Sequence, residues 1–325
     1  ARVVVFNSHG DSLLTYFTAT DANGEYSIEV PNRNLDGTGA DLYVQVYTEG
    51  YSGGYTGSDS AIALVRDSVQ HSAYFIRSGT IENNVRKEVT INMRAGNTGD
   101  NAGAFRIYDS LAIGFNYAFQ SLNLRPNQVP VWWPSDNTYY DNNSGMYLRS
   151  GDRWDKDVIL HEYGHYIAHQ SSVIQGDGGD PNHTWGRDLR TYFADRTDEE
   201  ARNLAFREAW ATTFAIGLQN SNPFDESPDI IYHDLADDDD RPGNYAKKND
   251  LEQCSTMTAL PGSRYAPGQY YEDMNTCALW DIIDASDGAT DAGDNIISTG
   301  LPEIWFVIRA GQANDIIDFW DSWFT

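Results

Sequence analysis

The segment DVILHEYGHYIA, residues 157–168, carries the most specific motif of the chain and sets the fold of the region around it. His161 and His165 are four residues apart, so on a helix they lie on one face, roughly 40° apart in azimuth. Two imidazoles placed in this way can bind one Zn²⁺ at roughly 2.0–2.1 Å. Glu162 follows the first histidine and lies beside such an ion, where it can accept a proton from a bound water. Because the chain has only 7 histidines, chance is a poor explanation of this H-E-x-x-H pattern.

The residues around the motif predict a helix. Acidic residues precede it, and Asp152 or Asp155 is placed to cap its amino end. Apolar residues recur at helical spacing and predict an inward-facing stripe at positions 158, 159, 163, 166 and 167. Gly164 weakens a helix, and we expect it to let a strand or a substrate backbone approach closely.

A catalytic metal site with one open position needs a third protein ligand. The extended motif H-E-x-x-H-x-x-G-x-x-H would need glycine at 168 and histidine at 171, where the chain has Ala168 and Ser171. His169 is rotated by about 80° from His161 on a helix, which favours a surface or supporting role. The third ligand must therefore come from another part of the chain.

A second helix is predicted over residues 197–218. Thr197 and Glu200 have the spacing of a capping box, and apolar residues recur through the segment. Glu208 falls among these apolar residues, where a buried carboxylate needs a cation or a metal. We therefore predict Glu208 as the third ligand. One alternative is an ion pair of Glu208 with Arg207 or Arg202. The other is a different third ligand, either Glu199 or Glu200 in the first turn of the helix or an acidic residue in 225–240.

These residues resemble those of the gluzincin metallopeptidases, the thermolysin-like branch of the zincins. The resemblance rests on His161-Glu162-x-x-His165 and on Glu208 in a later helix, and it covers about residues 105–325. It implies that His161, His165 and Glu208 bind Zn²⁺ while Glu162 acts as the base in hydrolysis of a peptide bond. A peptide or protein substrate is the partner that this resemblance implies.

One departure from the thermolysin-like pattern concerns the support of a histidine ligand. Those enzymes carry an aspartate four residues after the glutamate ligand, and this chain has Thr212 there. Because that aspartate orients a histidine, we expect a different carboxylate to do so here, if any does. The resemblance also implies that the strand at 145–149 is a sheet edge that binds an extended peptide by strand addition.

The resemblance further implies a donor that stabilises the developing oxyanion. Tyr270, Tyr271 and His233 remain open as candidates, and Tyr271 is carried forward as the predicted catalytic residue. Residues 183–185 are a candidate wall of the cleft. A weaker likeness, at 272–281, is to the downstream helix of a group of secreted bacterial zinc proteases.

The chain is strongly acidic, since 48 Asp and Glu residues against 22 Lys and Arg residues give a formal net charge of −26. This charge excludes a nucleic-acid-binding surface of the usual basic kind, and no apolar run is long enough for a transmembrane helix. The sequence begins on a strand pattern, as a trimmed mature protein would, and we expect a secreted or cell-surface protein. Four acidic residues among glycines also suit Ca²⁺: Asp284, Asp287, Asp291 and Asp294.

The two cysteines, Cys254 and Cys277, are close in sequence. In a secreted protein they are most simply explained as a disulfide, which stabilises by roughly 3 kcal/mol in the chain-entropy model. Two buried free thiols are the alternative.

The amino-terminal part of the chain has a different periodicity. Residues 1–94 predict short strands with alternating apolar side chains, at 2–6, 13–20, 25–30, 41–48, 73–77 and 88–93. Such a series predicts a β-sandwich, and residues 20–30 resemble the carboxypeptidase-regulatory-like, transthyretin-like domains of extracellular proteins. Residues 95–103 are rich in glycine and asparagine and predict a linker.

The remainder predicts a helix at 104–123 and strands at 129–133 and 145–148, followed mostly by helices. The expected fold class is therefore α+β. A β-sandwich domain over residues 1–94 precedes a zincin-like metallopeptidase domain, a small sheet plus helices, over residues 104–325.

The expected function is zinc-dependent hydrolysis of a peptide bond. Two alternatives remain: an extracellular adhesion or glycan-binding protein with a degenerate zincin domain, and a zinc hydrolase that acts on a non-peptide substrate. The intact Glu162 argues against the first, because a purely structural zinc site has no use for a base.

Overall fold

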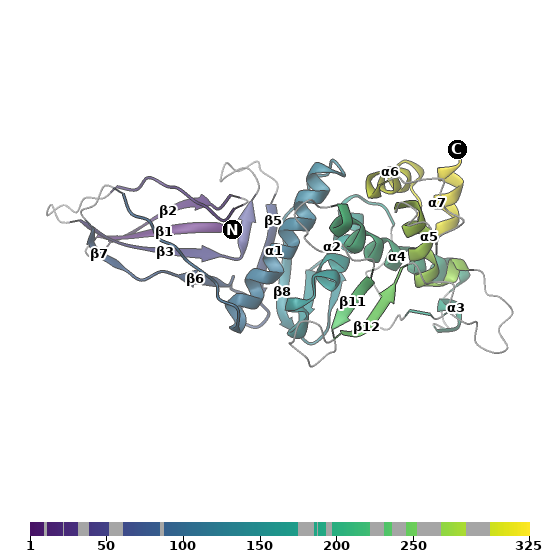
Figure 1. Ribbon diagram of the computed structural model, residues 1–325, viewed down its shortest axis with the longest axis horizontal. Coiled ribbons are helices and arrows are strands. Elements are labelled where there is room, and N and C mark those ends of the chain that lie inside the picture. Colours follow the sequence, from purple (N-terminus) through teal and green to yellow (C-terminus); the bar gives the residue numbers. More distant parts are fainter. Residues whose placement is uncertain are drawn as a thin grey trace. The chain divides into compact units, whose positions relative to one another are not determined.

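The computed structural model describes residues 1–9, 12–21, 23–31, 39–51, 61–84, 88–174, 185–186, 188–192, 197–221, 231–235, 245–251, 268–283 and 300–325. The protein is mixed α+β, as the sequence predicts (Figure 1). Contacts along the chain divide it into two compact units. The first holds residues Ala1–Ala112 and Asn127–Trp133, and the second holds Ile113–Pro126 and Pro134–Thr325.

The first unit is built on an antiparallel sheet with the strand order β2-β1-β3-β6, in which β7 also pairs with β3. Its strands are β1 (Arg2–His9), β2 (Ser12–Ala19), β3 (Ala40–Tyr47), β6 (Phe75–Arg77) and β7 (Ile81–Asn84). Alternate side chains of β1 and β3 face one side and form a buried core: Val3, Val5, Ala40, Leu42, Val44 and Val46. In β3 the burial alternates with a period of two, as the sequence pattern predicts, whereas in β1 Val4 is buried as well.

Two strands predicted in this unit, 25–30 and 88–93, are wrong as strands, because neither segment forms a ladder in the structure. Their alternation still has a structural cause. Side chains from both segments pack on the core of the sheet, and the Tyr26 hydroxyl donates to the Ile91 carbonyl at 2.9 Å. The apolar period reports which side chains are buried, whereas a strand also needs a hydrogen-bonded neighbour.

A strand that the sequence did not predict, β5 (Ala61–Asp67), pairs with β4 (Glu49–Tyr51) on one side and β8 (Val129–Ser135) on the other. The β5–β8 pairing is parallel and joins Ala63–Asp67 to Val129–Trp133. Residues 129–133 therefore group with the amino-terminal strands, and the division of the chain differs from the predicted boundary near residue 95.

The predicted linker at 95–103 overlaps a helix, because α1 spans Gly99–Gln120 rather than 104–123. Gly96 and Gly99 both have φ of 84°, a conformation that glycine adopts at little cost. These glycines give the segment its linker-like composition, and Asp100 in the first turn suits the positive end of the helix dipole.

The second unit includes the hairpin of β9 (Tyr139–Asp141) and β10 (Gly145–Arg149). Asp141 holds its turn by accepting from the backbone N–H groups of Asn143 and Ser144 at 3.0 and 2.8 Å. β9 pairs with β10 over Gly145–Tyr147. The predicted edge at 145–149 is therefore paired with β9 along its first three residues, so that side of the strand is not free to add a peptide there.

Helix α2 (Lys156–Gln170) carries the motif. Asp155 is its N-cap and accepts from the backbone N–H of Val158 at 3.2 Å, whereas Asp152 lies in the preceding 3₁₀ turn, η1 (Gly151–Trp154). Every residue from Asp157 to Ala168 is buried, so the helix is enclosed rather than striped. A helix enclosed on all sides is typical of the centre of a domain.

Helix α4 (Asp198–Ser221) packs on α2 and on α5 (Glu272–Ile283). The predicted capping box is confirmed. The backbone N–H of Glu200 donates to the Thr197 hydroxyl at 3.2 Å, and the Glu200 carboxylate accepts from the backbone N–H of Thr197 at 2.7 Å. These reciprocal bonds begin the helix one residue inside the predicted range.

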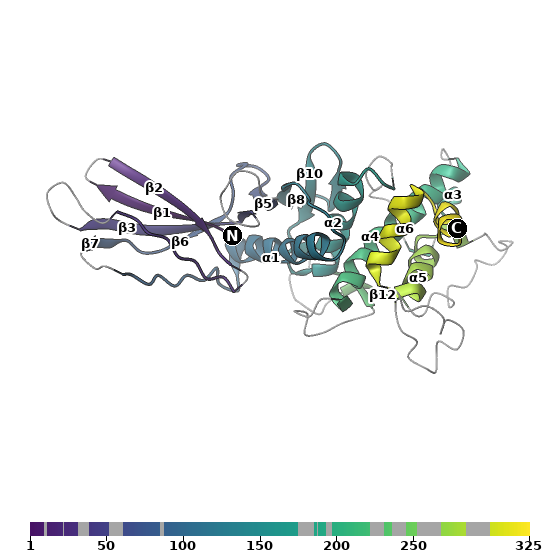
Figure 2. The ribbon, with the colours of Figure 1, turned by 90° about the horizontal axis from the view of Figure 1, so that it is seen from above.

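The helices α6 (Leu301–Gly311) and α7 (Ile316–Trp323) complete this unit. Helix α6 packs on α4 and α5 (Figure 2), and α7 packs on α6. The remaining elements are α3 (Leu189–Tyr192), β11 (Ile231–Leu235), β12 (Tyr245–Asp250) and η3 (Gly268–Tyr270). None of the described helices combines the length and apolarity that a membrane span needs.

Candidate metal centre

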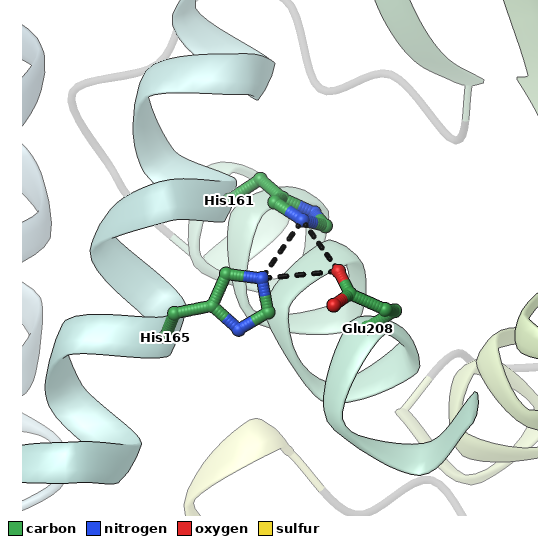
Figure 3. A group of neighbouring side chains, drawn as sticks. All are labelled: His161, His165 and Glu208. Carbon is green, nitrogen blue, oxygen red and sulfur yellow. Dashed lines mark hydrogen bonds and ion pairs between the residues drawn. The ribbon is translucent and has the colours of Figure 1, made fainter. Parts of the chain in front are cut away.

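Two helices bring three potential metal ligands together. His161 and His165 project from α2 toward Glu208 on α4 (Figure 3). The Nε2 atoms of the two histidines are 3.1 Å apart, and Glu208 Oε2 lies 3.2 Å from His161 Nε2 and 3.0 Å from His165 Nε2. The side chains of His161, His165 and Glu208 are 8%, 4% and 0% exposed. Three donors that converge on one point inside the protein could hold a metal ion.

The close approach of α2 and α4 depends on Gly164. A Cβ added at this position would lie 3.0 Å from the Ala211 Cα atom and 3.2 Å from its carbonyl oxygen. Trp210 then ties the helices together, since its indole N–H donates to the Gly164 carbonyl at 3.1 Å. The sequence analysis expected Gly164 to admit a strand or a substrate backbone. The segment that approaches it is instead the backbone of α4, the helix that carries Glu208.

Each histidine has a second ring nitrogen, and the two differ in their surroundings. His161 Nδ1 lies 3.0 Å from the Thr212 hydroxyl. His165 Nδ1 is buried and has no hydrogen-bond partner among the residues that the structure describes. The sequence analysis expected a carboxylate to orient a histidine, if any did, and the described partner of His161 Nδ1 is the hydroxyl of Thr212.

Three residues in the alternatives to a Glu208 ligand have other surroundings: Arg202, Glu199 and Glu200. Arg202 pairs with Asp315 at 2.7 Å, so it does not neutralise Glu208. Glu199 and Glu200 are exposed in the first turn of α4, and Glu200 belongs to the capping box. Position in the helix thus separates the solvated acids from the buried one.

Glu162 lies on α2 beside the first histidine and is 8% exposed. A carboxylate that is largely removed from solvent can act in proton transfer. Its role as a base remains a prediction.

The predicted oxyanion donors lie by a different part of α4. Tyr270 is buried against Leu189, Ala201, Leu204 and Ala205, and its hydroxyl donates to Asp198 at 3.3 Å. Tyr271 packs on the same cluster, and burial raises the pKa of its phenol above the usual value. No described contact brings Tyr271 to the metal ligands, so its catalytic role remains a prediction without structural support.

A tyrosine that the sequence reasoning did not identify packs directly on the centre. The ring of Tyr232 lies 5.8 Å from that of His161, centroid to centroid, and Trp185 stacks on Tyr232 at 6.2 Å. The predicted candidate, His233, is the next residue of β11, and its side chain is not among those described.

Two predicted features fall outside the described residues. Asp284, Asp287, Asp291 and Asp294, the proposed Ca²⁺ ligands, all lie there, and so does Cys254. Cys277 is buried on α5. Both the Ca²⁺ site and the Cys254–Cys277 disulfide therefore stay predictions.

Comparison with known proteins does not assign this metal centre to a family. No protein-family model matches the chain, and no curated protein matches it. The metal centre must be interpreted from its own residues.

Proposed function

We propose that this protein is a zinc-dependent hydrolase that cleaves peptide bonds. The proposal rests on one observation: His161, His165 and Glu208 place three donor atoms within 3.2 Å of one another, with Glu162 on the same helix as the histidines. It includes the two-domain arrangement, with a β-sandwich domain over residues 1–94 and a zincin-like domain over residues 104–325. The proposal also includes secretion, so the protein would cleave peptides or proteins outside the cell.

The donor set suits zinc. Two imidazoles and one carboxylate are typical ligands of catalytic zinc, which keeps a further position open. A tetrahedral ion with bonds of about 2.0–2.1 Å separates its ligand atoms by roughly 3.3 Å. The separations of 3.0 to 3.2 Å between these donors are close to that value. When bound, the ion would supply Lewis acidity that polarises a carbonyl and acidifies a water.

The residues of the chain would then divide the chemistry. Glu162 accepts the proton of the attacking water and delivers it to the leaving amine. His161, His165 and Glu208 hold the ion, and the burial of Glu208 excludes water that would compete for its carboxylate. Thr212 and the Trp210–Gly164 hydrogen bond fix the relative positions of the ligands.

Replacing Glu162 with glutamine tests the proposal. Glutamine keeps the size and polarity of the side chain but cannot act as a base, so cleavage of a peptide library should fall by about 10² or more. Zinc content, measured by mass spectrometry of the metal, should remain at the wild-type level. The exposed Glu303 on α6 gives a control, and Glu303→Gln should cleave like wild type.

Three results would contradict the proposal. A wild-type protein without zinc lacks the centre. Wild-type turnover by Glu162→Gln would show that Glu162 is not the base. A zinc-loaded protein that cleaves esters or non-peptide amides but no peptide keeps the centre and changes the substrate.

A further inference from the structure

Thr212 and Glu208 approach His161 from the same helix, one turn apart. Thr212 is completely buried, and its hydroxyl oxygen lies 3.0 Å from His161 Nδ1. Glu208 Oε2 lies 3.2 Å from His161 Nε2. Both ring nitrogens of His161 therefore have a partner on α4, which fixes the plane and direction of the imidazole.

We infer that Thr212 is a positioning residue whose hydroxyl reverses its hydrogen bond to His161 when the centre takes up its ion. This inference rests on the metal site of the proposed function. A neutral imidazole carries one N–H and one lone pair. We expect the Nε2–H of His161 in the metal-free protein to donate to the Glu208 carboxylate, 3.2 Å away, so that Nδ1 accepts and the Thr212 O–H donates.

Ion binding exchanges these roles. A metal ligand uses its Nε2 lone pair, so the proton of His161 must reside on Nδ1 and donate to the Thr212 oxygen. A hydroxyl serves in both states because it can donate as well as accept. An ionised carboxylate only accepts, so an aspartate at this position would support the metal-bound tautomer alone. The threonine hydroxyl can therefore hydrogen-bond to His161 Nδ1 and orient the imidazole in both states.

The second histidine shows what the hydroxyl contributes. His165 Nδ1 is buried without a hydrogen-bond partner among the described residues. Thr212 is thus the described support for the outer nitrogen of either histidine ligand. Without the Thr212 hydroxyl, neither histidine ligand would have a described hydrogen bond at its Nδ1 atom.

Three threonine variants test the positioning role through zinc affinity, measured by competition with a chromophoric chelator. Thr212→Val keeps the shape but removes the hydroxyl, and should bind zinc about 10- to 100-fold more weakly, as loss of a ligand's supporting hydrogen bond does. Thr212→Ser keeps a hydroxyl and should recover most of the affinity. Thr213 is the matched control, since it is equally buried and its hydroxyl has no described partner, so Thr213→Val should bind like wild type.

Nitrogen-15 NMR of the histidine side chains tests the reversal in the wild-type protein, which remains decisive if Thr212→Val fails to fold. We expect His161 to be protonated on Nε2 without zinc and on Nδ1 with zinc. The same tautomer in both states would overturn the reversal, and wild-type zinc affinity of Thr212→Val would overturn the positioning role. Neither readout depends on cleavage, so a protein that binds zinc in this way but cleaves no peptide would fail the proposed function alone.

Discussion

Glu208 shows how burial selects one acid from many at the scale of a single residue. The chain has 48 Asp and Glu residues, and most such side chains remain solvated at a protein surface. Glu208 is fully buried, where an unpaired carboxylate would be expensive, and its Oε2 atom lies 3.2 and 3.0 Å from two imidazole nitrogens. The same environment that makes the charge costly makes a bound cation favourable.

Removing this carboxylate should therefore abolish tight metal binding. Glu208→Ala leaves two histidine ligands, and we expect zinc affinity to fall by more than about 100-fold, beyond the 10–100-fold typical of supporting residues. Metal content after dialysis and chelator competition measure the change. Glu199→Ala removes an exposed acid from the first turn of α4 and is the control. Equal zinc affinity in the two variants would show that Glu208 is not a ligand.

The predictability of the centre differs from residue to residue. The pairing of His161 with His165 follows from local spacing, and Glu208 follows from its place in an apolar helical pattern. The contact of Thr212 with His161 depends on how far α4 is rotated and shifted against α2, and no local pattern carries that information. Tyr271 illustrates the converse, since a suitable side chain next to a predicted helix packs on a different cluster.

At the scale of elements, the start of α4 was predictable from the sequence, whereas the bounds of α1 and the pairing of the strands were not. The capping box at Thr197 identifies the start of α4 because all of its bonds are local. Residues 25–30 and 88–93 have a strand's alternation but no ladder, and β5 forms a parallel pair with β8 that is distant in sequence. Sheet hydrogen bonds depend on such distant neighbours, so periodicity alone misassigns them.

The packing of α2 on α4 makes a prediction about Gly164. Alanine gains up to about 1 kcal/mol of helix propensity over glycine. The Cβ of an alanine at position 164 would nevertheless lie 3.0 Å from the Ala211 Cα atom. Because Ala211 belongs to α4, relieving this close contact requires α4 to shift. Gly164→Ala should therefore displace Glu208 and Thr212 and weaken zinc binding about tenfold, the lower range for a disturbed supporting contact.

Gly217 on α4 provides the control for this variant. A Cβ there would meet the ends of the Ile283 and Leu301 side chains at 3.3 and 3.5 Å, which can adjust. Gly217→Ala should therefore keep wild-type zinc affinity. If Gly164→Ala binds zinc as tightly as Gly217→Ala and is also more stable, the close helix contact does not position the ligands.

The whole molecule concentrates its candidate chemistry in one of two compact units. His161, His165 and Glu208 all belong to the unit that contains Pro134–Thr325, while the sheet of β1, β2 and β3 belongs to the other. A ligand stabilises the structure that binds it by mass action, by about 4 kcal/mol at a thousand times its dissociation constant. If the two units unfold independently, that stabilisation should be confined to the second.

Hydrogen exchange with and without zinc measures where the stabilisation resides. We expect chelation to speed exchange at the amides of α2 and α4, which carry the three ligands, and to leave β1 and β3 unchanged. Glu208→Gln is the control, because it keeps the shape of the side chain but weakens the centre, so the chelator should have little effect on it. Equal loss of protection in β1 and α2 would show that the chain unfolds as one cooperative unit. Unchanged exchange throughout the wild-type protein would show that no metal holds the two helices together.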